Sequence, residues 1–542
     1  MTALTDGRSP GGVAELTGAE ALTASLAVHG VELLWGIPGT HNLDIYAALP
    51  AAGIRHLPAR HEQGAAFAAD GFARATGRPG VCLTTSGPAV LNAATALGQA
   101  WSDSVPVLLV APGMPSQHPG RGNGHLHETR DLRSALQGIV AESHRVASVQ
   151  EIPLAVAQAF ATMTAGRPRP VYVEVPYDLL VQTAPVTLVA PVPVGRTVPD
   201  RASLARAAAR LAGTESVTII AGGGAAGASA ELLAVAERLA APVVTTFNGR
   251  GAVPSTHPLG LGCGPHLATV RALVQESDAV LAVGTELAPA DLWDGPLPLE
   301  DRLVRIDIDP VQAVTNAAPD VCLVGDAGAA LAGLLDVWAR DGLAEPSAQR
   351  RERGQQWRAR MREEAQQASA RWGWLLDPLG DALGDNGIVA ADSSMACYYG
   401  ASVRLPAHRP RSFLYPSGYG TLGYGLPAGV GAKLGCPDAP VAVLIGDGGV
   451  MFTVAELAAA AQAGVTLPVI VADNGGYGEI HAEMVQRGQP PLAVEIPSPD
   501  FPALARSLGC HGERIEDAEA LAMGLERALA ADRPTVLHVR CP

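Results

Sequence analysis

The chain has 542 residues and a formal net charge of −15, which argues against a partner that presents a phosphate backbone, so no nucleic acid is expected to bind. At roughly 100 to 200 residues per domain, this length predicts about three domains. The N-terminal segment lacks the pattern of a signal peptide, and no apolar run approaches the roughly 18 residues of a membrane span. The 7 cysteines are scattered and form no CxxC pair, so we expect a reducing, cytoplasmic location without membrane contact.

Three α/β blocks follow one another along the chain, and we expect domains over residues 13–185, 199–340 and 370–542. Within each block, apolar strand segments alternate with helical segments, which predicts the α/β class with three doubly wound parallel sheets. The first block opens with a helix expected over 15–30. The Pro-rich stretch 183–199 predicts a linker, and the charged segment 347–367 predicts a helical connector before the third block.

The second block has three glycines in a GxGxxG spacing, at Gly222, Gly224 and Gly227, after a strand and before a helix. This spacing alone is a weak signal for a dinucleotide site, which also needs an acidic residue at the end of the next strand. That strand ends at 246–248, Thr-Phe-Asn, with no acidic residue. We therefore expect these glycines to allow close packing of strand and helix rather than to bind a nicotinamide cofactor.

The third block contains the pattern with the most chemistry. A buried strand, VAVLI, leads into the loop 446–448, Gly-Asp-Gly, and a second buried strand, LPVIVA, leads into the loop 473–476, Asp-Asn-Gly-Gly. The segment between them, 450–464, is expected to be a single helix. A strand, a crossover helix and a parallel strand bring both loops to the carboxyl edge of one sheet, where α/β sheets usually bind ligands.

At that edge, the Asp447 carboxylate and the Asn474 amide oxygen are expected to lie close together, with a backbone carbonyl near Gly476. Hard oxygen ligands of this kind suit Mg²⁺, and Gly448 and Gly449 allow backbone N–H groups to approach a diphosphate. The alternative is a pair of ordinary turns, in which glycine and Asx residues serve only the local backbone geometry. The Gly-Asp-Gly sequence alone does not decide between the two interpretations.

The spacing of the two loops resembles the cofactor motif of thiamine diphosphate (ThDP) enzymes, although Asp473 stands where that motif has Asn. Further segments occur in the order found in the family: HEQGAAFAADGFAR, TSGPAVLNA, HPLGLG, RIDIDP and GYGTLGYGLPAGVGAKLG. Over nearly its whole length, the chain therefore resembles the ThDP-dependent acetolactate synthase and 2-oxo acid decarboxylase family.

The resemblance implies roles for single residues. Glu62, just before an alanine-rich helix, matches the catalytic glutamate that hydrogen-bonds the pyrimidine ring of ThDP, a role that suits a carboxyl group because it can share a proton with a ring nitrogen. Without the motif, Glu62 would be an ordinary residue of a helix N-terminus. Leu422 matches the apolar residue that holds ThDP in a bent form, and the carbonyl of Gly420 matches the acceptor for its amino group. The resemblance also assigns cofactor contacts to Ser394, Gly446, Gly448, Gly449, Asn474 and Tyr477, and Mg²⁺ ligands to Asp447, Asn474 and Gly476.

The resemblance further implies the decarboxylation of a small-molecule 2-oxo acid. Protonation after loss of CO₂ gives an aldehyde, whereas attack on a second carbonyl compound gives a carboligation product such as acetolactate. In the family, the matching glutamate and the diphosphate site come from different subunits, so a homodimer or homotetramer with active sites between subunits is expected. A noncatalytic regulatory subunit is the alternative from another class of protein, but it would have lost Glu62, Asp447 or Asn474, and this chain retains all three.

Two further segments contain candidates for the substrate pocket. The loop GRGNGHLHET contains His125 and His127, candidates for proton transfer because imidazole titrates near neutral pH, and His127 is also a candidate for substrate binding. Acetolactate synthases usually have Phe-Gln where Leu126 and His127 stand. The turn GIPGTHNL adds Thr40 and His41 as candidate substrate residues. The alternative is that all of these are ordinary loop residues.

Glu479 and Glu483 lie one helical turn apart after the second loop, where acetolactate synthases carry Met and Trp. Acidic residues there suit a cationic substrate tail, although charged residues at this spacing usually mark a solvated helix face. The segments GHLHE, DSSMACYYG, GYGTLGYGLPA and GYGEI most resemble those of 5-guanidino-2-oxopentanoate (2-ketoarginine) decarboxylases. Flavin-binding synthases show Arg-Phe-Asp-Asp where this chain has GTELAPADLWDG, so FAD is not expected.

Overall fold

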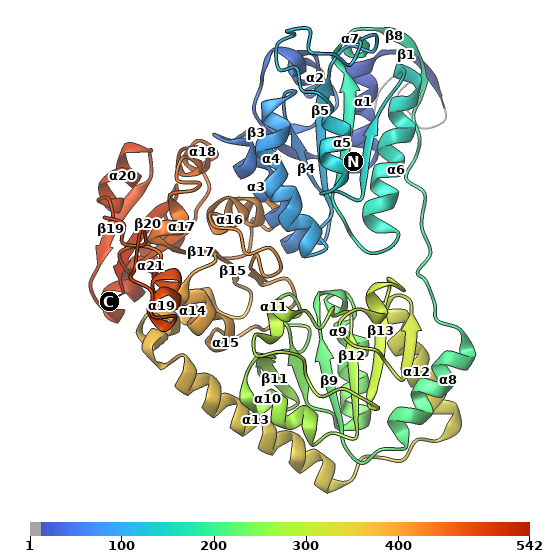
Figure 1. Ribbon diagram of the computed structural model, residues 1–542, viewed down its shortest axis with the longest axis vertical. Helices are drawn as coiled ribbons and strands as arrows, with labels where there is room; N and C mark the ends of the chain where they lie inside the picture. The colour runs from blue at the N-terminus through green and yellow to red at the C-terminus, as the bar shows by residue number, and fades with distance from the viewer. Residues whose placement is uncertain (1–11, 542) are drawn as a thin grey trace.

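The computed structural model describes residues 12–541, which fold into three lobes that follow one another along the chain (Figure 1). Each lobe is built on a sheet of 6 parallel strands flanked by helices, which confirms the predicted α/β class with three parallel sheets. Within this described part of the chain, no helix is both long enough and apolar enough to cross a membrane.

The N-terminal lobe has the strand order β3-β2-β4-β5-β7-β6. Its strands are β2 Leu33–Gly36, β3 Arg55–Pro58, β4 Gly80–Leu83, β5 Val107–Gly113, β6 Glu142–Arg145 and β7 Val171–Pro176. Its helices are α1 Gly18–Val28, α2 Leu43–Ala48, α3 Glu62–Thr76, α4 Pro88–Ser102, α5 Leu132–Gln137, α6 Ile152–Thr164 and α7 Tyr177–Leu180. The central strands β4, β5 and β7 are buried along their whole length, as expected for a parallel sheet covered on both faces.

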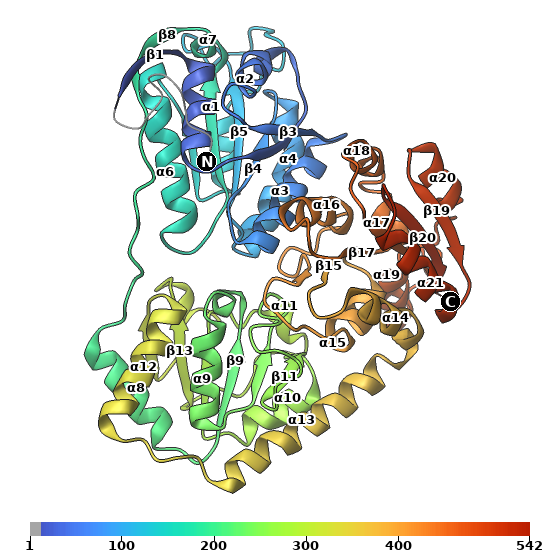
Figure 2. The same ribbon diagram turned by 180° about the vertical axis from the view of Figure 1, so that it is seen from behind.

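The middle lobe has the strand order β11-β10-β9-β12-β13-β14. Its strands are β9 Val217–Ala221, β10 Val243–Thr245, β11 Gly260–Cys263, β12 Ala279–Val283, β13 Leu303–Asp307 and β14 Val321–Val324. Its helices are α8 Arg201–Ala212, α9 Ser229–Leu239, α10 Ala268–Gln275, α11 Pro289–Leu292 and α12 Ala327–Asp341. The predicted connector is the helix α13 Ala348–Ala368, which runs beneath this lobe to the next one in both views (Figures 1 and 2).

The C-terminal lobe has the strand order β16-β15-β17-β18-β20-β19. Its strands are β15 Ile388–Ala391, β16 Phe413–Leu414, β17 Val441–Gly446, β18 Pro468–Asp473, β19 His511–Ile515 and β20 Thr535–Arg540. Its helices are α14 Gly373–Leu383, α15 Ser402–Arg404, α16 Gly425–Gly435, α17 Asp447–Val450, α18 Glu456–Gln462, α19 Gly478–Gln486, α20 Phe501–Ser507 and α21 Ala518–Leu529.

Two expectations about secondary structure are wrong. The helix expected over 15–30 begins only after a strand, β1 Val13–Thr17, which pairs antiparallel with β8 Thr183–Thr187 at the start of the expected linker. The irregular connection is therefore shorter, covering 188–200, and it runs along one side of the molecule (Figure 1). The helix expected over 450–464 is interrupted between α17 and α18, where the Thr453 hydroxyl donates to the Gly423 carbonyl instead of facing solvent on a helix.

Two of the three glycines of the GxGxxG spacing, Gly222 and Gly224, permit close packing, but against a neighbouring loop rather than between strand and helix, and a Cβ on Gly227 would meet no atom within 4 Å. A Cβ on Gly222 would lie 2.3 Å from the Gly284 carbonyl oxygen, and one on Gly224 would lie 2.8 Å from the Gly284 Cα. Gly284 follows β12, the strand next to β9 in the sheet. Gly222 and Gly224 therefore let the loops that follow two neighbouring strands approach each other closely.

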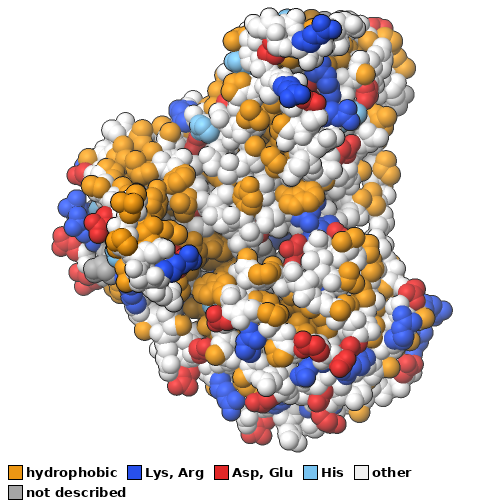
Figure 3. Space-filling model, in the orientation of Figure 1, with side chains coloured by type: hydrophobic (Ala, Val, Ile, Leu, Met, Phe, Trp, Pro, Cys, Tyr) orange, Lys and Arg blue, Asp and Glu red, His pale blue; other side chains and the backbone are white. Residues whose placement is uncertain are grey.

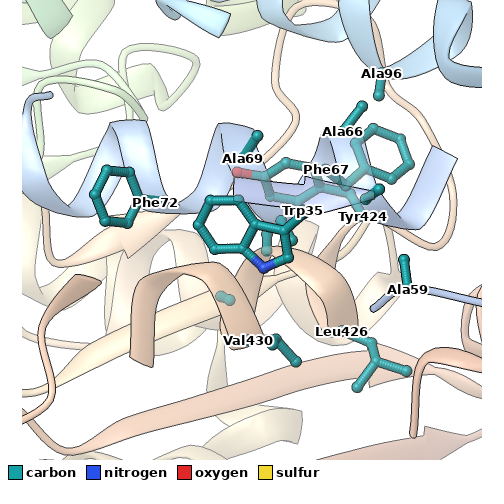
Figure 4. Packing of buried hydrophobic residues seen from close by; sticks show 14 of the residues in the cluster. Trp35, Ala59, Ala66, Phe67, Ala69, Phe72, Ala96, Tyr424, Leu426 and Val430 are labelled. Carbon is teal, nitrogen blue, oxygen red and sulfur yellow. The ribbon is translucent and has the colours of Figure 1, made fainter. Parts of the chain in front are cut away.

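The N-terminal and C-terminal lobes meet where α3 packs against α16 (Figure 4). The aromatic residues of this hydrophobic cluster include Trp35, Phe67, Phe72 and Tyr424. Two glycines let the helix backbones approach: a Cβ on Gly71 would lie 2.2 Å from the Ala428 carbonyl oxygen, and one on Gly431 would lie 1.9 Å from that of Ala68. A larger residue at either position must push the two helices, and hence the two lobes, apart.

We predict that Gly431→Ala destabilises the protein, although alanine normally favours a helix by roughly 0.5 to 1 kcal/mol over glycine. Overpacking costs about 1 to 3 kcal/mol, so the disturbed contact between α3 and α16 outweighs the gain in helix propensity. Thermal unfolding followed by circular dichroism should show a lower midpoint. Gly138→Ala is the matched control, because a Cβ there meets no atom within 4 Å and its φ of −81° suits alanine. Equal midpoints for the two variants would contradict the prediction.

Candidate active site

The two loops that were predicted to share a metal ion lie together at the carboxyl edge of the C-terminal sheet. The strands β17 and β18 are parallel neighbours, and Gly446 at the end of β17 pairs with Ala472 in β18. The helix α17 begins at Asp447, and the backbone N–H of Asn474 donates to Asp447 Oδ1 at 3.4 Å. The crossover connection thus brings two segments that are distant in sequence into contact.

Three oxygen atoms converge between these loops. The Asn474 side chain turns its amide oxygen toward the Asp447 carboxylate and the Gly476 carbonyl, so that only acceptors face one another. If the amide were reversed, its NH₂ group would donate to Asp447 Oδ1 at 3.1 Å and to the Gly476 oxygen at 2.9 Å. In the first orientation, a bound cation would balance the three facing oxygens. In the reversed orientation, the NH₂ group would bind the Asp447 and Gly476 oxygens and no cation would be needed. The set therefore fits a divalent cation that prefers oxygen ligands.

The backbone at Gly476 requires glycine. Its φ is +141°, and a Cβ would lie 2.1 Å from the Val494 carbonyl oxygen. The backbone N–H of Tyr477 donates to that same oxygen at 2.9 Å, and the N–H of Ile496 donates to the Gly475 carbonyl at 3.0 Å. The segment 494–496 therefore holds the second loop in place from outside the sheet.

Asp473, which stands where the ThDP motif has Asn, pairs with a residue on the neighbouring strand. Its Oδ2 lies 2.7 Å from His538 Nε2 in β20, and its Oδ1 accepts from the Ser498 hydroxyl at 2.8 Å. Burial raises the pKa of Asp473, but the hydrogen bonds from His538 and Ser498 outweigh it and leave this pKa below its usual value. Burial, followed by the charge of Asp473, raises the pKa of Asp447. The departure from the motif therefore adds negative charge beside the candidate cation site.

Small residues and an unpaired hydroxyl lie beside this oxygen set. A Cβ on Gly448 would lie 2.8 Å from the Tyr477 ring, and one on Gly449 would lie 2.5 Å from Asp392 Oδ2. The Ser394 hydroxyl follows β15 at the same edge and is buried, with no hydrogen-bond partner among the residues described. Because a buried polar group without a partner costs free energy, Ser394 fits a ligand that supplies acceptor oxygens, such as a phosphate.

The loop that carries Gly420 and Leu422 is held from two sides. The buried Asp392 carboxylate accepts from the backbone N–H groups of Gly423 and of the following residue at 2.8 and 3.1 Å. The Thr453 hydroxyl donates to the Gly423 carbonyl at 2.7 Å. Burial raises the pKa of Asp392 to about 7, although these N–H groups oppose the shift. The backbone next to Leu422 is thus held in place, while the Leu422 side chain is half-buried and remains accessible to a ligand.

Glu62 is the first residue of α3, at the carboxyl edge of the N-terminal sheet. Its carboxylate accepts from the Asn92 amide of α4 at 2.9 Å. A second carboxylate, Glu456 of α18, accepts from the backbone N–H groups of Arg60 and His61 at 3.0 and 2.9 Å. Burial raises the pKa of Glu456 to about 7, with a further contribution from the charge of Glu62 and opposition from these hydrogen bonds. The C-terminal lobe thus holds the backbone that leads into the helix carrying Glu62.

His41 and His127 lie together at the same edge of the N-terminal sheet. Ser86 stands between them, with its hydroxyl 2.6 Å from His41 Nδ1 and 3.4 Å from His127 Nδ1. The His41 ring stacks on Tyr177 with 4.7 Å between the ring centroids. Burial and the nearby His127 lower the pKa of His41, which favours the uncharged form of its ring.

The backbone of His127 has a φ of +61°, in the left-handed region that is uncommon for residues other than glycine. Gly87 makes room for it, because a Cβ there would lie 2.3 Å from the His127 carbonyl oxygen. Strained residues of this kind cluster at functional sites. His125 and Thr40 are placed differently from His127: both are exposed, and the His125 ring lies edge-on to His118 at 5.1 Å.

The two glutamates after the second loop have different partners. Glu479 Oε1 accepts from the Tyr399 hydroxyl at 2.7 Å, while Glu479 Oε2 is buried and has no hydrogen-bond partner among the described residues. Glu483 lies toward solvent and pairs with Arg487 at 2.9 Å, one turn along the same helix. The interpretation as a solvated helix face therefore applies to Glu483. Glu479 instead has an oxygen that can accept a hydrogen bond from a ligand.

Within one chain the two groups of candidate residues remain apart. No hydrogen bond or ion pair in the described part of the chain joins Glu62, His41 or His127 to the loops 446–448 and 473–476. Sequence reasoning missed the partners that hold the candidates in place, which are Ser86, Asn92, Tyr177, Asp392, Tyr399 and His538. Most of them lie inside or beside the motifs that were recognised, but a motif does not show which side chains meet.

Comparison with known proteins identifies the class. Residues 16–136 match the N-terminal TPP binding domain of thiamine pyrophosphate enzymes, residues 204–334 match their central domain, and residues 394–539 match their C-terminal TPP binding domain. The chain belongs to the thiamine pyrophosphate enzyme family, as the resemblance in its sequence predicted, and thiamine pyrophosphate is another name for ThDP.

Individual relatives include decarboxylases and synthases. The chain is 41% identical to the probable 2-ketoarginine decarboxylase AruI of Pseudomonas aeruginosa, over 97% of this chain and 94% of that protein. It is 32% identical to the probable acetolactate synthase large subunit of Methanocaldococcus jannaschii, over 97% of this chain and 92% of that protein. It is also 32% identical to an acetolactate synthase of Arthrospira platensis, over 97% of this chain and 94% of that protein. The chain is therefore more similar to the first relative than to the two synthases.

We predict that Glu456→Gln stabilises the protein above pH 7 and changes its stability little near pH 5. Because the pKa of Glu456 is about 7 in the folded state and 4.5 ordinarily, folding takes up a proton between these values, and the free energy of unfolding falls as the pH rises through them. The cost is on the order of 3 kcal/mol once Glu456 is ionised in both states. Glutamine is neutral and can still accept from the two N–H groups. Thermal midpoints of variant and wild type should diverge from pH 5 to pH 8; parallel curves would contradict the prediction.

Proposed function

We propose that the protein is a ThDP- and Mg²⁺-dependent decarboxylase of a 2-oxo acid, with 5-guanidino-2-oxopentanoate as substrate and 4-guanidinobutanal and CO₂ as products. In this non-oxidative reaction, the bond between the carbonyl carbon and the carboxylate breaks, CO₂ leaves, and the carbonyl carbon takes up one proton. Glu479 carries the proposal, because in the first turn of α19, directly after the second loop, it presents a buried carboxylate oxygen that has no partner among residues 12–541. A guanidinium group is a strong hydrogen-bond partner for a carboxylate. The 2-ketoarginine decarboxylase relative supports the same substrate.

The C-terminal half-site would hold the charged end of the cofactor. When bound, ThDP supplies a positively charged ring that takes up the electron pair of the broken bond. We assign Mg²⁺ to Asp447, Asn474 and the Gly476 carbonyl, because the Asn474 amide oxygen faces the other two oxygens and such oxygen ligands suit this ion. The residues assigned to the diphosphate are Ser394, Gly446, Gly448, Gly449, Asn474 and Tyr477.

The N-terminal half-site would hold the reacting groups. Glu62 is assigned to the pyrimidine ring of the cofactor, with Asn92 orienting its carboxylate. Leu422 and the Gly420 carbonyl would support the bent cofactor from the other half-site. We propose that His41 and His127 bind the substrate carboxylate or deliver the proton to the carbonyl carbon. Thr40 and His125 remain proposed substrate and proton-transfer residues at the exposed rim.

A complete site would require a second chain. Within the described part of one chain, no hydrogen bond or ion pair joins Glu62, His41 or His127 to the loops 446–448 and 473–476. We therefore propose a homodimer or homotetramer in which each active site takes one half from each of two subunits. Figure 3 shows hydrophobic side chains gathered over the C-terminal lobe, which supports a contact with another subunit there. The large exposed hydrophobic residues near the two loops are Met451, Phe452, Ile480, Val485, Leu492 and Ile496.

Some finer assignments belong to the same proposal. We propose the domain bounds 13–185, 199–340 and 370–542, and a cytoplasmic location, which the 7 free cysteines support. We also propose that the protein binds no FAD.

The alternative function is that of a carboligase, which joins the decarboxylated acid to a second carbonyl compound. The synthase relatives favour this alternative. His127 and Glu479 favour the decarboxylase, because acetolactate synthases usually carry Gln and Met there.

Carbon dioxide release tests the proposal. Purified protein with ThDP and Mg²⁺ is offered 5-guanidino-2-oxopentanoate and pyruvate separately, and the products are identified by mass spectrometry. We expect selective turnover of the guanidino acid to its aldehyde. Acetolactate formed from pyruvate would favour the carboligase instead, and silence with both acids would refute the proposed substrate.

Within that assay, we predict that Glu479→Gln raises the KM for the guanidino acid about tenfold or more, because a hydrogen bond to a charged group contributes roughly 1.5 to 3 kcal/mol. The KM for pyruvate should change little, since pyruvate has no cationic tail. Glu483→Gln makes the same change one turn away, where the carboxylate is already paired with Arg487, and should have at most about a twofold effect. Equal losses for both acids, or a larger loss in Glu483→Gln, would count against Glu479.

We also predict that two inactive variants restore activity when they share one oligomer. Glu62→Gln disables the N-terminal half-site, and Asp447→Asn disables the C-terminal one. If each site combines halves from two subunits, a mixed dimer has one site with both defects and one site with none. Differently tagged variants, co-expressed and purified as the mixed dimer, should recover about half of the wild-type activity. A mixed dimer as inactive as its parents would show that sites do not form between subunits.

A further inference from the structure

A row of aromatic side chains extends from the middle lobe toward the carboxylate of Glu479. His266 and Trp293 stack with 3.8 Å between their ring centroids, and the Trp293 ring meets Tyr399 edge-on at 6.0 Å. Phe247 also stacks with His266, at 6.3 Å. Tyr399 belongs to the C-terminal lobe and the other three belong to the middle lobe, so the row crosses the boundary between the lobes.

Tyr399 connects this row to Glu479. Its hydroxyl donates to Glu479 Oε1 at 2.7 Å, which leaves Oε2 as the oxygen without a partner among the described residues. Tyr399 lies in a π-helical segment, Cys397–Ala401, and such segments often occur at functional sites. Burial and the hydrogen bond to Glu479 raise the pKa of Tyr399, so its hydroxyl keeps its proton and remains a donor.

Trp293 is held in a conformation that leaves its ring available. Its φ of +50° lies in the left-handed region, which is costly for a bulky residue, and its indole N–H donates to the Ala290 carbonyl at 3.0 Å. The side chains of Trp293 and Tyr399 are 43% and 39% exposed, so a ligand can reach both rings. Burial lowers the pKa of His266 to about 4, so the ring stacked on Trp293 is uncharged at neutral pH and does not repel a cation.

Arg487, which follows the last residue of α19, pairs with Glu483 and not with Glu479. Figure 3 shows hydrophobic side chains along the recess between the C-terminal and middle lobes. A buried carboxylate oxygen beside exposed aromatic rings suits a ligand whose cationic group is flat and is carried on an apolar chain.

We propose that Glu479, Tyr399 and Trp293 form a site for a planar guanidinium group, and that the two rings make this site selective over a primary ammonium group. The proposal rests on the proposed function, because it places the far end of the same substrate. A guanidinium group can donate to the free Glu479 Oε2 while its flat face lies against an aromatic ring. An ammonium group is compact and strongly hydrated, and it gains less from such a ring.

Direct binding tests this selectivity without turnover. Calorimetric titration of the ThDP- and Mg²⁺-loaded enzyme compares 4-guanidinobutanoate with 5-aminopentanoate, two unreactive acids of similar reach that differ in the cationic end. The wild type should bind the guanidino acid about tenfold more tightly. Trp293→Leu and Tyr399→Leu should lower this ratio severalfold, whereas Trp293→Phe, which keeps an aromatic face, should retain most of it. Trp101→Leu is the matched control, since Trp101 is 41% exposed and lies outside the row.

An unchanged binding ratio in folded Trp293→Leu and Tyr399→Leu would overturn the proposal. If Trp293→Leu does not fold, Trp293→Met removes the ring with a more flexible side chain and gives the same test. Turnover separates this proposal from the proposed function. Selective binding of 4-guanidinobutanoate without decarboxylation of 5-guanidino-2-oxopentanoate would refute the function and keep the site. Decarboxylation by an enzyme whose variants bind with wild-type selectivity would keep the function and refute the site.

Discussion

The buried guanidinium of Arg74 is the contact on which the arrangement of the three lobes depends. It lies between the carboxylates of Asp70 and Asp103, at 2.6 and 2.8 Å, within the N-terminal lobe. It also donates to Asn248 of the middle lobe at 3.1 Å and to the Tyr415 carbonyl of the C-terminal lobe at 3.2 Å. Burial lowers the pKa of Arg74, but the two carboxylates outweigh it and keep the group charged. Because loss of one partner would leave a buried charge unpaired, the lobes are held by a set of contacts that tolerates little change.

The same charged network reaches the loop that carries Leu422. Asp70 accepts from the Tyr424 hydroxyl at 2.7 Å, and Asp103 accepts from the backbone N–H of Gly418 at 2.9 Å. The loop is therefore held at both ends by residues that also hold the lobes together, and Asp392 adds two hydrogen bonds at its C-terminal end. Docking of the lobes and the shape of the candidate cofactor site consequently depend on one continuous set of buried polar contacts.

Features encoded in consecutive residues could be predicted from the sequence. The crossover that brings Asp447 and Asn474 together follows from two strands and their order, and α13 follows from its composition. The pairing of β1 with β8 could not be predicted, because it joins segments far apart in the chain, and the break before α18 depends on the contact of Thr453 with another loop. Glu479 and Glu483 look equivalent in sequence, and so do His125 and His127. Their partners in space separate them, and those partners come from other elements.

The contact of Trp293 with Tyr399 makes the middle lobe a wall of the candidate substrate site, although that lobe supplies none of the residues assigned to the cofactor. It is joined to the rest of the chain by the irregular segment 188–200 and by α13, and it touches the charged network through Asn248. A small rigid-body shift of this lobe would move Trp293 relative to Glu479 and alter the depth of the site. The length of side chain that the enzyme accepts can thus evolve through substitutions at the lobe boundary, with the catalytic groups left as they are.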